Sequence, residues 1–346
     1  MSAAIQTDLR RQVETMSNGQ MTVRFTAKGQ PSYFYRLRKF TVESIGANLG
    51  AGVHPAFIVG GAEKDEILIG THQAAEVNGE MVSHAGRLPR ATINFDDSLA
   101  LARNTGTHFC VVTNVMYAAL ALQCRAAGRF PRGNTNFGRA HNAFEEFGIN
   151  GSGDPASGGS THTVIRAGSG PIAWNHPPNP FGVQNLNGNV WEWSPGMRIN
   201  NGEIQIIPDN DAALAATDLS ASSGAWRAIA ATDGSLVAPG NSVSVKYAVS
   251  GTAAGTLVCA SGAAFSSMVS HGVSAAALDR LRQHGLMPPS SPLGGDGFFL
   301  TLTDERMPIR GGHWVRGSRA GVFALLLSLA RSSADTSIGF RPAFVI

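Results

Sequence analysis

The sequence predicts a loop-rich globular fold assembled from short strands and a few helices. Its 346 residues include 41 glycines and 17 prolines, and only 15% of them are charged. This composition is typical of a chain with many turns rather than of a helical bundle. Apolar and aromatic residues occur along the whole length, which argues against disorder. Segments with strand alternation and segments with helical spacing are both present, in a length that suits one large domain or two ordinary ones.

Charge, cysteine content and hydropathy exclude several classes of protein. The formal net charge is +3 and the densest basic run is "RLRKF" at 36–40, so we expect no nucleic-acid partner. The three cysteines form no C-x-x-C pair, which favours reduced thiols over disulfides or a zinc site. The N-terminus lacks the pattern of a secretory signal. No window approaches the roughly 20 apolar residues that span a bilayer, and we expect no membrane insertion.

The first third of the chain predicts strands. The segment "QMTVRFTA" at 20–27 alternates apolar and polar residues, and residues 33–60 also favour strands. In "KDEILIGTHQA" at 64–74, Ile67 and Ile69 would lie on one face of a strand and Leu68 on the other. The following Asn-Gly pair in "VNGE" is a hairpin turn signal.

Three segments predict helices, each with its own start and stop residues. "INFDDSLALARNTG" at 93–106 has Asn94 as cap and a glycine at its end. "TNVMYAALALQCRAAGRF" at 113–130 begins at Thr113 or Asn114 and has apolar residues every three or four positions. "SAAALDRLRQHGL" at 274–286 has Ser274 as its cap.

Residues 131–182 are rich in Gly, Ser, Asn and Pro and predict ordered irregular structure or a functional surface. The short glycine runs "GSG" and "SGGS" within this stretch have no strand–loop–helix context with a following lysine, so phosphate binding is disfavoured. After the "LNGN" turn, Trp191 and Trp193 would share one face of a strand, as a core anchor, with Val190 and Glu192 on the other.

Catalytic and metal-binding motifs are missing from the sequence. It contains no H-E-x-x-H, G-x-S-x-G or G-x-x-x-x-G-K-[ST] pattern. The scattered histidines favour surface or core roles over catalysis. The oxygens of Asp209, Asn210 and Asp211 suit calcium, although an acidic turn without an ion is the commoner case. We therefore expect no cofactor, with calcium as the one candidate.

Two motifs together resemble formylglycine-generating-enzyme-like domains. They are "FGVQNLNGNVWEW" at 181–193, and "IRGGHW" at 309–314 followed by "IGFR" at 338–341. The resemblance implies an α+β, C-type-lectin-like fold of the formylglycine-generating-enzyme type, poor in regular secondary structure, over residues 40–346. Residues 1–39 would form an N-terminal arm or small accessory segment. The oxidase members carry cysteines just before the closing motif, whereas "ARSSADTSIGFR" has none.

The tail resembles more closely the variable proteins of diversity-generating retroelements, the group that includes phage tropism determinants. Their fixed frame matches the following residues: Gly311, Gly312, Trp314, Gly317, Gly321, Val322, Phe323, Ala324, Leu325, Leu327, Ala330, Arg331, Ile338, Gly339, Phe340 and Arg341. In that family, adenine-directed mutagenesis rewrites Asn codons. The corresponding positions here are His313, Val315, Arg316, Arg319, Leu326, Ser328, Leu329, Ser333, Asp335 and Ser337. All ten of these residues are reachable from an AAY codon, and Ser318 and Ala334 are left open.

The run "GVFALLLSLA" at 321–330 therefore has two interpretations. As a strand, it would place Phe323, Leu325 and Leu327 on a core face, and Val322, Ala324, Leu326 and Ser328 on an outward face. A wholly buried helix or strand is the alternative.

The resemblance implies a diversified ligand-binding protein rather than an enzyme, with residues 311–341 as its variable ligand-binding region. The partner would be a protein or another host-surface ligand, as in host-receptor binding by a phage or prophage. The protein would reside in a virion, at the phage tail, or in the cytoplasm before assembly. The alternative function is that of a formylglycine-generating-enzyme-like oxidase or oxygenase, which the missing cysteine pair disfavours.

Overall fold

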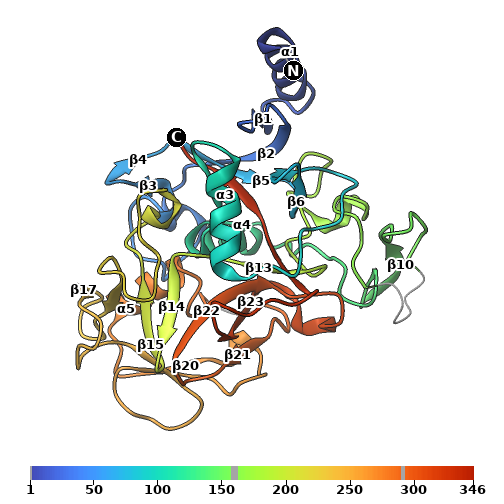
Figure 1. Ribbon diagram of the computed structural model, residues 1–346. Helices are drawn as coiled ribbons and strands as arrows, with labels where there is room; N and C mark the ends of the chain where they lie inside the picture. The colour runs from blue at the N-terminus through green and yellow to red at the C-terminus, as the bar shows by residue number, and fades with distance from the viewer. Residues whose placement is uncertain (1, 157–162, 290–292) are drawn as a thin grey trace.

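The computed structural model describes residues 2–156, 163–289 and 293–346 (Figure 1). Two sheets organise the chain. The smaller has the strand order β1-β2-β5-β25-β8 and is antiparallel throughout. Its strands are β1 (Met21–Phe25), β2 (Pro31–Arg38), β5 (Glu66–Gly70), β8 (Phe109–Val111) and β25 (Pro342–Phe344). Because β25 lies between β5 and β8, the end of the described chain is built into the middle of this sheet.

Within the described residues, the larger sheet has twelve strands and carries the segment expected to vary. The strands around the variable segment are β22 (Glu305–Gly311), β23 (Gly321–Leu329), β13 (Trp191–Trp193), the edge strand β24 (Ile338–Phe340), β14 (Met197–Asn200) and β15 (Glu203–Ile206). Shorter strands extend it: β16 (Arg227–Ile229), β17 (Leu236–Val237), β18 (Lys246–Ala248), β19 (Thr256–Val258), β20 (Val269–His271) and β21 (Phe298–Leu300).

The remaining strands form four two-stranded ladders. They are β3 (Ile58–Val59) with β4 (Ala62–Glu63), β6 (Ala74–Val77) with β7 (Glu80–Ser83), β9 (Arg139–Ala140) with β10 (Ala143–Phe147), and β11 (Asn175–His176) with β12 (Val183–Gln184). The β6–β7 turn confirms the predicted hairpin, because Asn78 and Gly79 both have positive φ, 52° and 76°.

Five α-helices and five short 3₁₀ turns lie within the described residues. The helices are α1 (Ala3–Met16), α2 (Val42–Ile45), α3 (Phe95–Thr105), α4 (Asn114–Ala126) and α5 (Ala275–Gln283). The 3₁₀ turns are η1 (Pro55–Phe57), η2 (Ile172–Trp174), η3 (Asp211–Ala213), η4 (Phe265–Ser267) and η5 (Gly317–Arg319). Asn94, Thr113 and Ser274 cap α3, α4 and α5 through their side chains, which confirms the predicted helix starts. Among the described residues, no helix has the length and hydropathy to cross a membrane.

Helix α4 is almost entirely buried and links the two sheets. Its apolar residues belong to one core cluster with Ile67 and Ile69 of the small sheet and with Leu325 and Leu327 of the large one. Leu68 faces a second cluster, which also holds Trp191 and Trp193. The predicted division of β5 into two faces is therefore confirmed. The α+β class, with few helices and many short strands, is confirmed as well.

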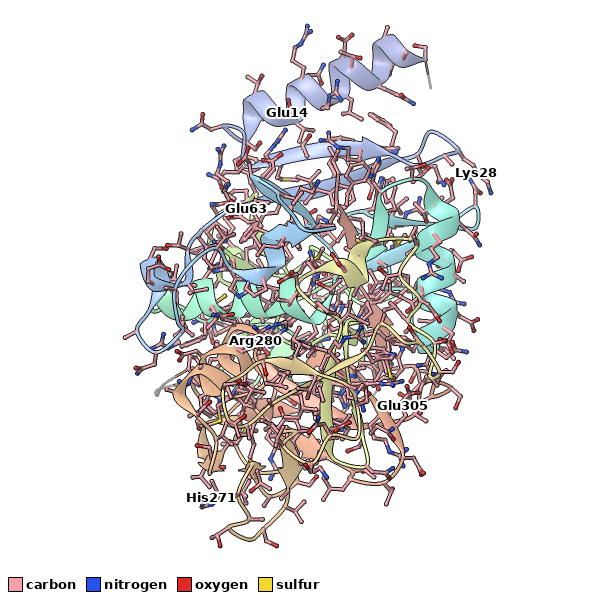
Figure 2. The ribbon with its side chains drawn as sticks, turned by 90° about the vertical axis from the view of Figure 1, so that its left-hand side faces the viewer. Glu14, Lys28, Glu63, His271, Arg280 and Glu305 are labelled. Carbon is pink, nitrogen blue, oxygen red and sulfur yellow. The ribbon has the colours of Figure 1, made fainter. Side chains whose placement is uncertain are left out.

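The segment 1–39, expected to form an N-terminal arm or small accessory segment, has two parts within its described residues 2–39. Helix α1 has no buried residue and projects from the molecule (Figure 1). At its end, the Glu14 carboxylate accepts from Thr22 Oγ1 at 2.6 Å and pairs with Arg36 at 2.7 Å (Figure 2). Strands β1 and β2, in contrast, belong to the small sheet through β5. Within residues 2–39, the two strands are thus part of a sheet and the helix is not.

The prediction of strands across 33–60 is wrong beyond residue 38. The chain forms α2 and η1 instead, and β3 supplies only two residues. Pro55 begins η1, where its fixed φ suits a helical turn and its missing N–H costs nothing. The His54 ring also accepts the N–H of Ala56, so local capping replaces strand pairing here.

Candidate functional site

Strand β23 occupies the centre of the candidate site. It pairs antiparallel with β22 and parallel with β21, so Phe298–Leu300 run beside Leu325–Leu327. A helix over this segment is therefore excluded, whereas a strand was part of both interpretations. Phe323, Leu325 and Leu327 lie in the main core and are at most 1% exposed. The predicted core face of this strand is therefore confirmed.

The opposite face of β23, which we expected to face outward, is buried as far as Leu326. From residue 321 to residue 327 the alternative of a wholly buried strand therefore holds. Val322 and Ala324 are buried, and Leu326 is only 8% exposed. Ala324 and Leu326 pack in the second cluster with Trp191 and Ile309. Side chains of the neighbouring strands cover this face, and alternation along one strand cannot reveal them. The outward face begins only at the half-buried Ser328.

The loop between β22 and β23 carries His313, Val315, Arg316 and Arg319 around the short turn η5. Val315 is 50% exposed, whereas His313 is buried. The His313 ring lies 6.3 Å from the ring of Trp191 and 5.0 Å from that of Trp314. Burial, and secondarily the charge of Arg316, lowers the pKa of His313 to about 4. The imidazole is therefore neutral near pH 7.

Trp314 fixes this loop to the rest of the fold. Its side chain is buried, its carbonyl accepts the N–H of Phe137 at 2.7 Å, and its N–H donates to Asn189 O at 3.3 Å. Gly312, with φ of 85°, passes so close to Ala320 that an added Cβ would lie 2.4 Å from the Ala320 Cβ. The replaceable residues thus sit on a backbone held by fixed neighbours.

Arg316 lies over an aromatic platform. Its Cζ is 4.9 Å from the centre of the Phe299 ring and 5.9 Å from that of Trp191, and these two rings meet edge to face at 6.2 Å. Such contacts hold a guanidinium by cation–π attraction. Burial, followed by the charge of Arg319, lowers the pKa of Arg316. The platform brings Arg316, Leu326 and His313 together.

The other replaceable residues lie at the end of β23 and in the segment after it. Leu329 packs partly against the second cluster, and Ser333 is half-buried. The Asp335 carboxylate accepts from the N–H and the hydroxyl of Ser337, at 2.8 and 2.6 Å, and these bonds lower the pKa of Asp335. The charge of Asp335 also opposes the lowering of the His313 pKa.

Arg331 anchors the chain between the end of β23 and the replaceable residues at 333–337. Its guanidinium contacts Glu305 at 2.8 Å and Asp96 at 2.7 Å. Glu305, labelled in Figure 2, also pairs with Arg198 at 2.7 Å. The frame residue expected to be fixed thus joins β22, α3 and the variable segment.

Phe299 was missed by sequence reasoning, and Trp191 was assigned to the core alone. Phe299 lies in "GFFL", a short apolar run without a motif. Only its parallel pairing with Leu326 places it under Arg316. Trp191 and Trp193 are at most 1% exposed, which confirms the core anchor, and Trp191 also supports the site.

The turn 185–189 is closed by a buried amide. Gln73 Nε2 lies within 3.4 Å of four oxygens: the carbonyls of Asn185, Gly188 and Val190, and the carboxylate of Glu192. Gly188 has φ of 80°, as the predicted turn requires. The turn is therefore held by Gln73, which directly precedes β6 in the sequence.

The acidic turn considered for calcium is held by protein hydrogen bonds. Asn210 is buried, with its Oδ1 accepting from Thr113 and its Nδ2 donating to Ala56 O. Asp211 accepts the N–H of Gly60 at 2.6 Å. Across the described residues, no three His, Cys, Asp or Glu side chains are grouped as metal ligands would be. The "SGGS" run at 157–160 falls in the part of the chain outside the described residues.

No protein-family model and no curated protein matches the chain. Among solved structures, Treponema denticola variable protein 1 matches with a TM-score of 0.37 and 10% identity, over 94% of this chain and 98% of that one. The P3c and U1 variants of Major Tropism Determinant each match with a TM-score of 0.32 and 13% identity. They cover 90% of this chain, which spans 62% of their length. The chain is thus similar in structure to a solved variable protein and to two solved tropism determinants.

Proposed function

We propose that this chain is a diversified ligand-binding protein whose segment 311–341 forms the recognition surface and is rewritten by a diversity-generating retroelement. One observation carries the proposal. Every frame residue except Gly317, Ala330 and Arg331 is buried, whereas every replaceable residue except His313 and Leu326 is at least partly exposed. Packing thus constrains the frame, and solvent tolerates change at the positions between its residues.

The two buried replaceable residues, His313 and Leu326, lie directly beneath the proposed recognition surface. His313 contacts the ring of Trp191, and Leu326 belongs to the same cluster as Trp191. Both positions therefore adjoin the platform that supports Arg316. Substitution there would alter the surface from below, which agrees with a role in recognition.

The ligand of this surface is a protein or another molecule on a host cell, and a phage tail is the proposed carrier. The support is the matching order of the frame and replaceable positions in the tail. A rigid frame with exposed replaceable residues is the arrangement that a receptor-binding surface needs. The ligand-binding role requires no catalytic group and no cofactor.

The oxidase alternative lacks a reactive thiol. Cys110, Cys124 and Cys259 are all buried. Burial raises the pKa of Cys110 to about 12 and also raises those of Cys124 and Cys259. A protonated, enclosed thiol is a poor nucleophile and a poor metal ligand. None of the three therefore fits the role of the missing cysteine pair.

Sequencing of the DNA beside the gene and of sister isolates tests this function. We expect a near-copy of the 311–341 coding segment with adenines at the replaceable codons, and a reverse-transcriptase gene nearby. Differences between isolates should concentrate at positions such as Arg316 and Leu326. Equal variation at Trp314, Leu325 or Gly339 would contradict the proposal.

A further inference from the structure

We infer that the surface formed by Phe299, Val315, Arg316 and Arg319, here called the Arg316 patch and supported from below by the buried Trp191, binds a carboxylate that is flanked by an apolar group, as in an acidic segment of a protein ligand. The inference rests on the proposed function, because it gives the chemistry of the ligand for that same surface.

The guanidinium of Arg316 is supported by aromatic rings, but it has no hydrogen-bond or ion-pair partner among the described residues. Phe299 and Trp191 support its face, and its Nε is enclosed without a hydrogen-bond partner among the described residues. No hydrogen bond from its Nη1 or Nη2 occurs within the described part of the chain, and neither atom is among the enclosed ones. A stacked guanidinium with free edge donors is prepared to bind a planar acceptor in bidentate fashion.

Arg319 adds a second unpaired positive charge on the same loop. Neither Arg316 nor Arg319 forms an ion pair with any described carboxylate, whereas Arg331 and Arg341 in the same segment do. The carboxylates near these arginines in sequence or space have other hydrogen-bond partners. Asp335 accepts from Ser337, and Asp296 accepts the N–H of Phe323. The two guanidinium charges repel each other, so an anion between them would lower the free energy.

The neighbouring side chains favour a carboxylate over a more highly charged group. Val315 is 50% exposed and Phe299 is partly exposed, so the donors of Arg316 adjoin apolar surface. Such surface makes a single, weakly hydrated charge with an attached apolar side chain a better fit than phosphate. Glutamate or aspartate next to an aromatic or aliphatic residue has this chemistry.

A matched pair of peptides tests the inference on the full chain. The probes are Ac-Gly-Phe-Glu-Phe-Gly-amide and the same peptide with glutamine in place of glutamate. Titration followed by ¹H–¹⁵N NMR should show at least about tenfold tighter binding of the glutamate peptide, with shifts in the loop 313–319. The enclosed Nε–H of Arg316 should also shift on binding.

Variants identify the residues responsible. Arg316→Gln should abolish the preference for glutamate, and Arg319→Gln should weaken it, while Arg11→Gln on the exposed helix α1 should leave it unchanged. Unchanged amide spectra outside the loop show that each variant is folded. Arg316→Lys should retain only part of the preference, because it keeps the charge but loses the planar fork.

Three outcomes would overturn the inference: equal binding of the two peptides, retention of the preference in Arg316→Gln, or tighter binding of inorganic phosphate than of the glutamate peptide. Failure of the proposed function would appear differently, as a missing template copy or as variation at frame codons. The peptide titration does not depend on either of these.

Discussion

The guanidinium of Arg341 holds both carboxylate oxygens of Glu192 in the interior of the protein. Its Nε lies 2.9 Å from Oε2 and its Nη2 lies 2.6 Å from Oε1, with side-chain exposures of 0% and 2%. Glu192 comes from the "NVWEW" motif and Arg341 from the closing "IGFR". This buried ion pair therefore joins the two motifs on which the resemblance depends. Glu192 lies in β13, and Arg341 directly follows β24, which pairs parallel to β13.

Breaking this pair should destabilise the protein strongly. Glu192→Gln leaves the buried Arg341 guanidinium without its counter-charge, and we expect a loss of about 3–5 kcal/mol in the free energy of unfolding. Urea denaturation followed by tryptophan fluorescence measures it. Glu305→Gln, at the half-buried pair with Arg331, is the comparison and should cost less. A similar loss in both variants would contradict the central role of the Glu192–Arg341 pair.

Two glycines of the loop should differ in their tolerance of alanine. Both Gly312 and Gly317 have positive φ, 85° and 55°, but only at Gly312 would a Cβ collide, 2.4 Å from the Ala320 Cβ. Gly317→Ala should cost about 1 kcal/mol for its backbone conformation alone. Gly312→Ala should cost about 1–3 kcal/mol more because of the collision. Thermal unfolding of the two variants measures this difference. Equal melting temperatures would show that the loop shifts to accommodate a Cβ at position 312.

The buried position of Leu326 makes it unlike its replaceable neighbour Ser328. Leu326→Ala removes a side chain packed in the cluster of Trp191 and should cost about 2–4 kcal/mol. Ser328→Ala should change stability by no more than about 0.5 kcal/mol, because this residue is half-exposed. Chemical denaturation of both variants provides the measurement. If Leu326→Ala proved neutral, the second cluster would not extend beneath the recognition surface.

Asp296 should introduce a pH dependence into stability. Burial raises the pKa of Asp296 to about 7, whereas an unfolded aspartate titrates near 3.9. Between about pH 4 and 7 the folded protein holds a proton that the unfolded chain releases. The stabilising contribution of this group is therefore fully present at low pH and is lost as the pH rises through 7.

The variant Asp296→Asn isolates this effect, since its amide oxygen can still accept the N–H of Phe323. The difference in unfolding free energy between wild type and variant should fall by on the order of a few kcal/mol from pH 4 to pH 7.5. Denaturation series at both pH values measure it. A constant difference would mean that Asp296 does not bind a proton in the folded state over this range.

Chelation should leave the protein unchanged. The Asp209–Asp211 turn is closed by hydrogen bonds to Thr113, Ala56 and Gly60, so no calcium ion is needed to hold it. We expect the same melting temperature in EDTA and in millimolar calcium. A rise of several degrees on adding calcium would establish a bound ion.

Local patterns in the sequence predicted much of this fold. Cap residues gave the starts of three helices, and alternation divided β5 and the core face of β23 correctly. The second face of β23 was predicted wrongly, because periodicity groups residues by side but does not say what covers each side. Phe299 and Trp191 reach the site from other strands. Their contribution depends on tertiary pairing, which no local pattern encodes.

Leu326 has a consequence for how such a surface would explore new ligands. It lies next to Phe299 in the parallel register, and Phe299 carries the guanidinium of Arg316. A larger or smaller residue at 326 would tilt the ring and move the charge above it, without any change in the exposed residues themselves. Two copies with identical outer side chains would then present different shapes. Variants of this segment would then differ in the position of the charged group as well as in the identity of the exposed side chains. Each variant would lose some stability through the changed packing at position 326.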